Sequence, residues 1–268
     1  MSSIKSFWDG RAADPSLDPK QVTHPDVWQR WLEIETIKPL LCAGDRVIDI
    51  GCGAGYATRQ FAPLVGAIKG VDFSAGMIER AMADAEVPAN ASFDVCDVLE
   101  LSLARFGLFD LAISVRCLIN LSDWATQQRA IDKIASIVRP GGRYIFLEGS
   151  SDGRAGLNQA RVGLGLEAMS PVWHNVDFAR ARTLAYLDHS FALVREISFG
   201  VYDLIARIVH PLLVAPEAPR YDARINEVAA RVAAALPGLD HLSRVLCLEL
   251  ERRDGSGVSR AGAAGARG

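Results

Sequence analysis

The sequence predicts an α/β protein built around a doubly wound, mostly parallel sheet with helices on both faces. Two observations predict this fold class. Short apolar runs alternate with segments of helical periodicity between residues 46 and 149, and this alternation is typical of right-handed βαβ units. A turn with three alternating glycines directly follows the first apolar run, at the kind of position where open α/β sheets bind ligands.

The alternating region contains the elements of highest regularity. Strands are expected at residues 46–50, 67–73, 91–98, 109–115 and 143–149. Helices are expected at residues 56–65, 74–87 and 122–138. Ser74 is placed to cap the second helix, and Ser122 or Asp123 the third. The RPGG sequence ends the third helix, and the run at 109–115 is uniformly apolar, as in buried parallel strands.

The chain outside this region is less regular. Residues 24–41 have helical periodicity, whereas residues 150–176 are rich in glycine and predict an irregular segment with at most one short helix. The remaining expected elements are a helix at 177–190, a strand at 191–199, helices at 201–213 and 223–236, and a strand at 243–253. The tail at 254–268 is small and polar and is expected to be disordered.

Composition and charge exclude several classes of function. The formal net charge is −3 and no run of lysine and arginine stands out, so a nucleic acid is not expected as a partner. Arg207, His210 and Pro211 interrupt the most apolar stretch, so no membrane-spanning helix is expected, and the first residues lack the apolar core of a signal peptide. The five cysteines are scattered, which predicts buried thiols in a reducing cytoplasm and no metal site.

The glycine turn predicts a site where backbone approaches a ligand closely. Gly51, Gly53 and Gly55 form a G-x-G-x-G pattern, in which Tyr56 takes the place of the last glycine of a dinucleotide-binding turn. Asp72 ends the next strand, where a carboxylate can accept hydrogen bonds from both hydroxyls of a ribose. The spacing therefore favours a nucleoside ligand without a pyrophosphate.

Four further residues are candidates for the site, and two of them, Asp97 and Met77, have both a binding and a structural interpretation. Asp97 is able to accept from an adenine amino group, or to cap a helix. Met77 is able to pack on an adenine, or simply belongs to the core. Asp49 is placed to attract an ammonium group, and Cys52 is expected to be a small buried thiol and not a nucleophile.

The segments "VIDIGCGAGYAT", "GVDFSAGMIERA", "CDV", "FDLAISV" and "VRPGGRYIF" resemble the successive motifs of class I S-adenosylmethionine-dependent methyltransferases, over residues 40–150. The resemblance implies a Rossmann-like sheet of seven strands, the last antiparallel, and S-adenosylmethionine as the cofactor. It implies that Asp49, Gly51 and Gly53 hold the methionine part. The other cofactor-binding residues that follow from it are Cys52, Asp72 at the ribose, Phe73 and Met77 at the adenine face, Asp97 and Val98 at the adenine edge, and Val115.

The methyl acceptor is expected to lie beside "SVRCLINL", after the fourth strand. This segment lacks the Asn/Asp-Pro-Pro-aromatic box of enzymes that methylate planar amines and the acidic ligands of metal-dependent catechol methylases, so no metal is expected. Arg116 and Asn120 are the candidate substrate-binding residues. Arg116 suits a carboxylate or phosphate, or it pairs with a structural acid such as Glu148.

The base for a hydroxyl acceptor is expected to be a histidine. His174 in the irregular segment is the first candidate and His24, before the first helix, the second, together with Arg116 as catalytic residues. Either histidine is alternatively a hydrogen-bonded loop residue. The long connection at 200–238 predicts a helical cap that lends Tyr202 and Arg207 to a substrate. It alternatively packs on itself or on a second copy, which would make a homodimer.

These observations predict three parts: residues 1–40 close over the site, 41–253 form the methyltransferase domain with the insertion at 200–238, and 254–268 form the tail. The expected function is transfer of a methyl group from S-adenosylmethionine to a small polar or anionic metabolite, at oxygen in preference to nitrogen, in the synthesis of a secondary metabolite or surface sugar. The alternatives are an enzyme that rearranges the cofactor and releases methylthioadenosine, and a cofactor-binding partner protein without activity.

Overall fold

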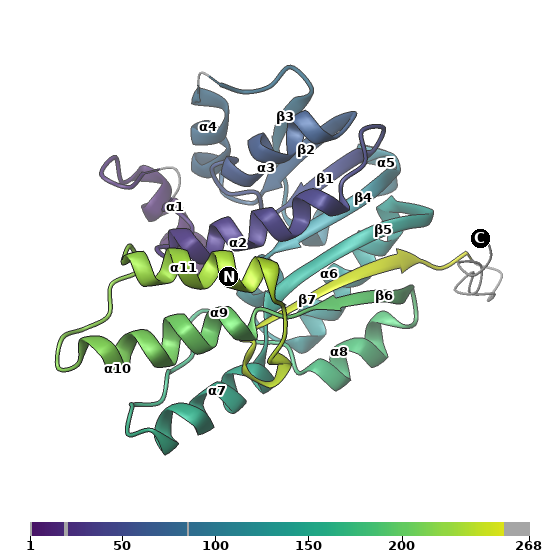
Figure 1. Ribbon diagram of the computed structural model, residues 1–268. Coiled ribbons are helices and arrows are strands. Elements are labelled where there is room, and N and C mark those ends of the chain that lie inside the picture. The colour runs from purple at the N-terminus through teal and green to yellow at the C-terminus, as the bar shows by residue number, and fades with distance from the viewer. Residues whose placement is uncertain (1, 19–20, 85, 255–268) are drawn as a thin grey trace, which may run out of the picture.

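The computed structural model describes residues 2–18, 21–84 and 86–254. Apart from Asp254, the tail expected to be disordered lies outside the described residues. The strands are β1 (Arg46–Ile50), β2 (Ala67–Asp72), β3 (Ala91–Val95), β4 (Phe109–Val115), β5 (Val138–Gly149), β6 (Phe191–Ile197) and β7 (Val245–Arg252). They form one sheet in the order β3-β2-β1-β4-β5-β7-β6 (Figure 1).

The topology of this sheet confirms the predicted fold class. Strand β7 pairs antiparallel with both β5 and β6, whereas the other neighbouring strands are parallel. Strand β1 lies between β2 and β4, so the strand order reverses direction beside it. In such a sheet a ligand site is expected outside the carboxyl ends of β1, β2 and β4.

Helices cover both faces of the sheet, as Figure 1 shows. Their bounds are α1 (Ser2–Ala13), α2 (Val27–Ile37), α3 (Tyr56–Phe61), α4 (Ala75–Ala83), α5 (Leu103–Phe106), α6 (Trp124–Ile137), α7 (Ser151–Gly163), α8 (Arg180–Leu187), α9 (Gly200–Leu204), α10 (His210–Val214) and α11 (Arg224–Ala235). Ser74 accepts from the amide of Met77 and Asp123 from that of Thr126, so the predicted caps of α4 and α6 are present. Among the described residues, no helix is long and apolar enough to cross a membrane.

The strands divide the core into two layers because successive side chains point to opposite faces. Val47 and Ile113 lie in a cluster with α2, α3, α9 and α11. Ile48 and Ala112 lie in a second cluster with α6 and α8. The strands in the middle of the sheet therefore carry buried apolar side chains on both faces, as their sequences indicate.

The glycine-rich segment after β5 differs from its prediction. It forms helix α7, which Ser150 caps by accepting from the amide of Gly153. A Cβ atom on Gly153 would lie 1.6 Å from the carbonyl oxygen of Ser243, and one on Gly156 would lie 2.1 Å from that of His241. These glycines therefore allow a helix to pack against neighbouring backbone, and they do not mark an irregular loop.

The insertion between β6 and β7 is helical, as predicted. Helix α9 continues through a π-helical turn (Ile205–Val209) into α10, and α11 follows after a loop. Helices α11 and α9 pack together, and α11 lies along α2 (Figure 1). The insertion is thus held against the N-terminal part of the chain on one face of the sheet.

Candidate functional site

Two adjoining hollows lie at the carboxyl ends of β1, β2 and β4. The α2 hollow is lined by Trp8, Thr23, His24, Arg30, Glu33, Ile34, Ile37, Asp49, Gly51, Cys52, Gly53, Ala57, Phe61, Asp72, Phe73, Met77, Val115, Arg116, Cys117 and Asn120. The β3 hollow is lined by Ile4, Lys5, Ile50, Gly51, Asp72, Phe73, Cys96, Asp97, Val98, Cys117, Asn120, Leu121 and Ser122. Gly51, Asp72 and Phe73 line both hollows, so the second strand and the glycine turn separate them.

The glycine turn forms the floor of the site. Gly51, Gly53 and Gly55 have φ angles of 74°, 54° and 75°, which L side chains rarely adopt. A Cβ atom on Gly51 would lie 2.5 Å from Sγ of Cys117, and one on Gly53 would lie 2.5 Å from Cγ2 of Thr23. Any side chain here would displace its neighbours, which explains why the sequence has glycine at these positions.

Asp72 joins the glycine turn to the start of α4. Its Oδ2 accepts from the amide of Gly53 at 3.0 Å, and its Oδ1 accepts from the amide of Ser74 at 2.9 Å. Burial raises the pKa of Asp72 to about 6. Each oxygen retains a second lone pair, so the carboxylate is able to accept further hydrogen bonds from a ligand in either hollow.

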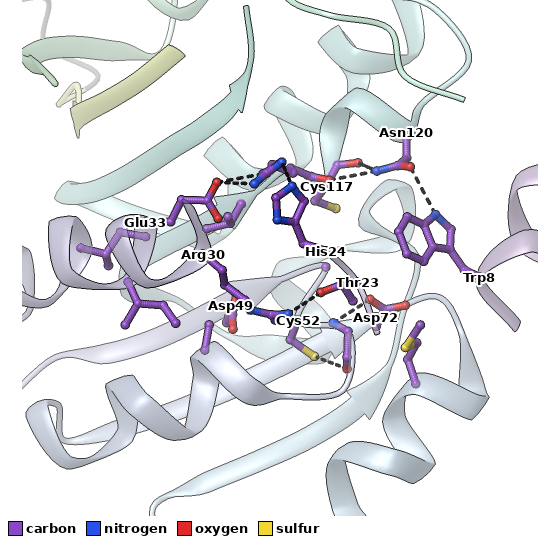
Figure 2. Close-up of a pocket in the computed structure, with 18 of the residues that line it drawn as sticks. Trp8, Thr23, His24, Arg30, Glu33, Asp49, Cys52, Asp72, Cys117 and Asn120 are labelled. Atoms are coloured by element: carbon purple, nitrogen blue, oxygen red, sulfur yellow. Dashed lines mark hydrogen bonds and ion pairs between the residues drawn. The ribbon is translucent and has the colours of Figure 1, made fainter. Parts of the chain in front are cut away.

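Asp49 lies deep in the α2 hollow. Its Oδ2 accepts from the hydroxyl of Thr58 at 2.5 Å, and burial raises the pKa of Asp49 to about 6, against the hydrogen bond from Thr58 and the nearby charge of Arg30. Arg30 donates to the hydroxyl of Thr23 at 2.8 Å and stacks on the ring of Tyr56, 5.0 Å from its centroid. An acid and an arginine are therefore presented to the same hollow (Figure 2).

Each predicted cofactor residue lines at least one hollow. Phe73 lines both hollows, Val115 and the buried Met77 line the α2 hollow, and Val98 lines the β3 hollow. Asp97 lines the β3 hollow and also caps the 3-10 turn Val98–Glu100, where its Oδ1 accepts from the amide of Leu99 at 2.9 Å. The two interpretations of Asp97 are thus compatible, because its other oxygen is not used by the cap.

Two cysteines in the α2 hollow remain thiols. Burial is the largest cause that raises the pKa of Cys52 and Cys117 well above the ordinary value, and nearby carboxylates raise it further. Since the thiolate is the reactive form, neither side chain is poised as a nucleophile. This agrees with the expectation of a buried thiol at Cys52.

Arg116 pairs with a structural acid, as one of its two interpretations predicts, but the acid is Glu33 of α2 and not Glu148. Its Nε and Nη2 donate to Oε1 of Glu33 at 2.9 and 2.6 Å. Glu148 instead accepts from the hydroxyl of Ser114 at 2.9 Å and from the amide of Leu118 at 3.1 Å. Glu148 is fully buried, lines neither hollow and accepts from amides of the turn that follows β4.

His24 is held as a neutral imidazole. Nη1 of Arg116 lies 2.7 Å from Nε2 of His24, and because a guanidinium only donates, Nε2 accepts. Nδ1 then carries the proton and donates to the carbonyl oxygen of Asp26 at 3.0 Å. Burial, followed by the charge of Arg116, lowers the pKa of His24 well below its ordinary value. Figure 2 shows His24 between Thr23 and Cys117 in the hollow.

Asn120 links the turn after β4 to helix α1. Its Nδ2 donates to the carbonyl oxygen of Arg116 at 2.9 Å, and its Oδ1 accepts from Nε1 of Trp8 at 3.2 Å (Figure 2). Asn120 lines both hollows, as expected for a substrate-binding candidate. Both polar atoms of its side chain therefore bond to the protein. A ligand that contacts Oδ1 would have to share or replace the hydrogen bond from Trp8.

His174 is not placed in either hollow, which differs from its prediction as the first candidate base. Its ring packs against Phe7, Trp8 and Trp173, with centroid separations of 4.8, 5.7 and 4.9 Å. The ring of His174 is therefore part of an aromatic cluster with Phe7, Trp8 and Trp173. Trp8 lies between His174 and the α2 hollow, which explains why His174 does not line it.

Tyr202 and Arg207 are also outside both hollows, so the insertion does not cap the site as predicted. The hydroxyl of Tyr202 donates to the two carboxylate oxygens of Asp26 at 2.7 and 2.8 Å, and Arg207 forms a buried ion pair with the same carboxylate. Asp26 in turn caps α2 by accepting from the amide of Gln29 at 3.0 Å. The insertion therefore supports the helix that lines the α2 hollow.

The prediction that residues 1–40 close over the site names only His24 from α1, α2 and the segment between them as a site residue. Trp8, Thr23, Arg30 and Glu33 line the α2 hollow but were not among the predicted site residues. The sequence contains a signal for Arg30 and Glu33. Arg30 and Glu33 are spaced by three residues on the face of α2 that also carries Ile34 and Ile37, so two charges stand on an apolar face.

Comparisons with known proteins agree with the fold. Residues 47–142 match the family described as "Methyltransferase domain". An O-methyltransferase of Penicillium expansum is 29% identical over 150 residues, which cover 54% of this chain and 50% of that protein. The chain spans about half the length of the curated relatives that it matches first.

Solved structures share the fold at low sequence identity. The N-methyltransferase NodS of Bradyrhizobium japonicum, in complex with S-adenosyl-l-homocysteine, has a TM-score of 0.57 and 17% identity, over 94% of this chain and 99% of that one. The [4+2]-cyclase SpnF has a TM-score of 0.57 and 17% identity, over 94% of this chain and 96% of that one. These two proteins are named for different reactions although they share one fold.

Proposed function

Because residues 47–142 form a domain of the class I methyltransferase family, we propose that the protein transfers a methyl group from S-adenosylmethionine to a small polar metabolite. The observation that carries the proposal is the meeting of two unlike hollows at Asp72. S-adenosylmethionine has an adenine and an amino acid joined through a ribose, and the proposal assigns one part of the molecule to each hollow and one to their junction.

The residues in the β3 hollow fit an adenosine. Asp72 would accept from the ribose hydroxyls with its remaining lone pairs. Phe73 and Val98 offer apolar surface for the purine, and the second oxygen of Asp97 would accept from the amino group. The glycine turn supports this fit, since Gly51 lines both hollows without a side chain to occupy them.

The residues in the α2 hollow fit the amino acid part. Asp49 would attract the ammonium group, together with the backbone of Gly51 and Gly53. Arg30 would hold the carboxylate, because its guanidinium lies in the same hollow and is fixed by Thr23 and Tyr56. When bound, S-adenosylmethionine supplies an electrophilic methyl group on a positively charged sulfur.

The acceptor would occupy the remaining part of the α2 hollow, beside His24, Glu33 and Arg116. We favour an oxygen acceptor, because a hydroxyl must lose its proton and this part of the hollow offers a carboxylate and a neutral imidazole. The Arg116–Glu33 pair is already neutral, so a neutral polar acceptor fits it as well as an anion. A secondary metabolite or a surface sugar is the class of product that we propose.

One alternative keeps the binding site and changes the reaction. The similar fold of a [4+2]-cyclase favours testing for chemistry without methyl transfer, such as rearrangement that releases methylthioadenosine. A binding protein without activity is less favoured, because the glycine turn and Asp72 are both intact. We also propose a cytoplasmic location, since the five cysteines are free thiols. A homodimer stays a prediction.

Mass spectrometry of the protein incubated with S-adenosylmethionine and a fractionated small-molecule extract tests the proposal. We expect S-adenosylhomocysteine together with a metabolite that is heavier by one methylene group. Methylthioadenosine would instead support the rearranging enzyme. Intact S-adenosylmethionine in every fraction, with tight binding, would overturn the proposed activity and favour the binding protein.

A further inference from the structure

We propose that Glu33 is the group that takes the proton from the methyl acceptor, with Arg116 holding its carboxylate in place. The acceptor molecule would accordingly present a hydroxyl or an amine N–H to Oε2 of Glu33. This inference rests on the proposed methyl transfer, and it assigns a residue that lay outside every sequence prediction for the site.

The two oxygens of Glu33 have different surroundings. Oε1 accepts from Nε and Nη2 of Arg116 at 2.9 and 2.6 Å, and from Nε2 of Gln29 at 3.4 Å. Oε2 accepts no hydrogen bond from the part of the chain that the structure describes, although Glu33 lines the α2 hollow. One oxygen is thus fixed by the protein while the other remains for a ligand. Figure 2 shows Glu33 on the same side of the hollow as Arg30 and His24.

The other titratable groups of the hollow are less suited to this task. Nε2 of His24 accepts from Arg116, and Nδ1 is already protonated. Both oxygens of Asp72 accept backbone amides. The thiols of Cys52 and Cys117 have pKa values raised well above the ordinary value, so they are protonated at neutral pH. Asp49, whose Oδ2 accepts from Thr58, is assigned to the ammonium group of the proposed cofactor, and Asp72 to its ribose. Glu33 is therefore the carboxylate of this hollow with an oxygen that neither a described protein group nor a proposed cofactor contact uses.

The surroundings of Glu33 also adjust its basicity. Burial is the largest influence and raises its pKa, Asp26 raises it further, and the charges of Arg116 and Arg30 lower it. Cys247 packs nearby as a thiol whose pKa is raised to about 12, so it contributes no charge. A carboxylate whose pKa is raised takes up a proton more readily, which suits a general base near neutral pH.

The proposed step balances without a further reactant. The O–H or N–H bond of the acceptor breaks, its proton forms a bond to Oε2 of Glu33, and its electron pair stays on the acceptor atom, which becomes the nucleophile. Glu33 becomes a neutral carboxylic acid beside Arg116. The proton then passes to water when the product leaves, which restores the carboxylate and its ion pair.

The test compares Glu33→Gln with His24→Gln and with Glu35→Gln. Glu35 is the matched control, because it lies on the same helix, pairs with Lys38 and does not line the α2 hollow. Turnover is measured with the extract fraction that yields S-adenosylhomocysteine in the wild type. Calorimetry with S-adenosylhomocysteine measures ligand binding, and infrared titration of the carboxyl band measures protonation of Glu33 in the absence of turnover.

We expect Glu33→Gln to lower kcat by at least about 100-fold, while affinity for S-adenosylhomocysteine changes by less than about threefold. The wild-type rate should rise with pH through the pKa of Glu33, and this rise should be absent in Glu33→Gln. A purely structural role would not remove it. A carboxyl band that titrates above the ordinary glutamate range should also disappear in Glu33→Gln and remain in Glu35→Gln.

Two results would overturn the inference. One is a Glu33→Gln rate within about threefold of the wild type; the other is loss of rate and of the pH dependence in His24→Gln but not in Glu33→Gln. A wild type that forms no S-adenosylhomocysteine contradicts the proposed function itself. An active wild type with an active Glu33→Gln contradicts only the role of Glu33, so the two failures are distinguishable.

Discussion

The amide of Arg116 donates a hydrogen bond of 2.8 Å to the carbonyl oxygen of Leu147, while Arg116 itself has a φ angle of 51°. This left-handed conformation is uncommon for a residue other than glycine and costs energy. The bond to β5, and the bond from the side-chain Nδ2 of Asn120 to the carbonyl oxygen of Arg116, hold the backbone there. The conformation turns the guanidinium back from the end of β4 toward α2.

Replacing Arg116 isolates the cost of this conformation. Arg116→Ala and Arg116→Gly both remove the ion pair with Glu33, but glycine adopts a positive φ angle without strain. We therefore expect Arg116→Gly to be more stable than Arg116→Ala by about 1 kcal/mol. Urea denaturation followed by circular dichroism measures the difference. Equal stabilities would indicate that the backbone is not strained at this residue.

Asp72 is expected to control ligand affinity. Asp72→Ala should weaken binding of S-adenosylhomocysteine by about 1–3 kcal/mol, because a buried hydrogen-bonding carboxylate is lost. Asp94→Ala is a suitable control, since Asp94 lies on β3 and pairs with Arg105 outside both hollows. Calorimetry of the two variants and the wild type gives the comparison. Unchanged affinity in Asp72→Ala would contradict the assignment of the ribose site.

The raised pKa of Asp72 also predicts how binding depends on pH. Burial raises this pKa to about 6, so the free protein holds a proton on Asp72 at lower pH. A ligand that needs the carboxylate must displace that proton, and affinity should fall by up to about tenfold per pH unit below the pKa. Asp49, whose pKa is also raised to about 6, adds to the effect. Calorimetry between pH 5 and pH 8 tests it, and a flat profile would contradict the prediction.

Glu148 predicts a pH dependence of folding. Burial raises its pKa in the folded protein to about 7, above its value in the unfolded chain. Between these two pKa values the folded state holds a proton that the unfolded state has lost, so stability falls as pH rises, by at most about 1.4 kcal/mol per unit for one group. Glu148→Gln cannot titrate and should have a smaller slope between pH 5 and pH 7 in urea denaturation. An unaltered slope would exclude Glu148 as the source.

Arg207 is expected to contribute to stability and not to contact a ligand. Arg207→Met leaves Asp26 buried without its ion-pair partner, which should lower the free energy of unfolding by about 3–5 kcal/mol. Tyr202→Phe removes only hydrogen bonds to the same carboxylate and should cost about 1 kcal/mol. Affinity for S-adenosylhomocysteine, measured where both variants are folded, should stay close to the wild type. A large loss of affinity in Tyr202→Phe would argue for a direct contact.

Two glycines of α7 provide a matched pair. A Cβ atom on Gly153 would lie 1.6 Å from the carbonyl oxygen of Ser243, whereas nothing lies within 4 Å of one on Gly163. We expect Gly153→Ala to destabilise the protein by about 3 kcal/mol or more, because backbone must move. Gly163→Ala should stabilise it by up to about 1 kcal/mol. Thermal denaturation of the two variants decides whether α7 is packed as described.

Most of the sheet could be predicted because its signals are local. Most strands between residues 46 and 149 contain a short apolar run, although β5 begins at Val138, before the predicted start at residue 143. The turn after β1 contains Gly51 and Gly53, which adopt the positive φ angles that glycine allows. The prediction of an irregular segment at residues 150–176 was wrong for α7, because glycine occurs where a helix packs closely as well as in loops. The sequence around Gly153 does not reveal that Ser243 will lie against it.

The acceptor side of the site was harder to predict for a related reason. Arg116 and Glu33 are 83 residues apart, and their contact depends on how α2 docks on the sheet. His174 is a histidine in a segment predicted to be irregular, which made it a candidate base. Its contacts with Phe7 and Trp8 of α1 are long-range, so the sequence around His174 does not predict them. The charged residues Arg30 and Glu33 on the apolar face of α2 are the local feature that indicates a helix lining the site.

The contacts of Asp26 have a consequence for engineering this protein. Its carboxylate is held by Tyr202 and Arg207 from the insertion, while its carbonyl oxygen accepts a hydrogen bond from Nδ1 of His24. A chimera that exchanges the insertion with that of another protein would therefore not transplant selectivity for a metabolite, since the insertion lines neither hollow. It would instead change how rigidly α2 and His24, which line the α2 hollow, are held in position. Changes of selectivity should instead be sought in α1, in α2 and in the turn after β4.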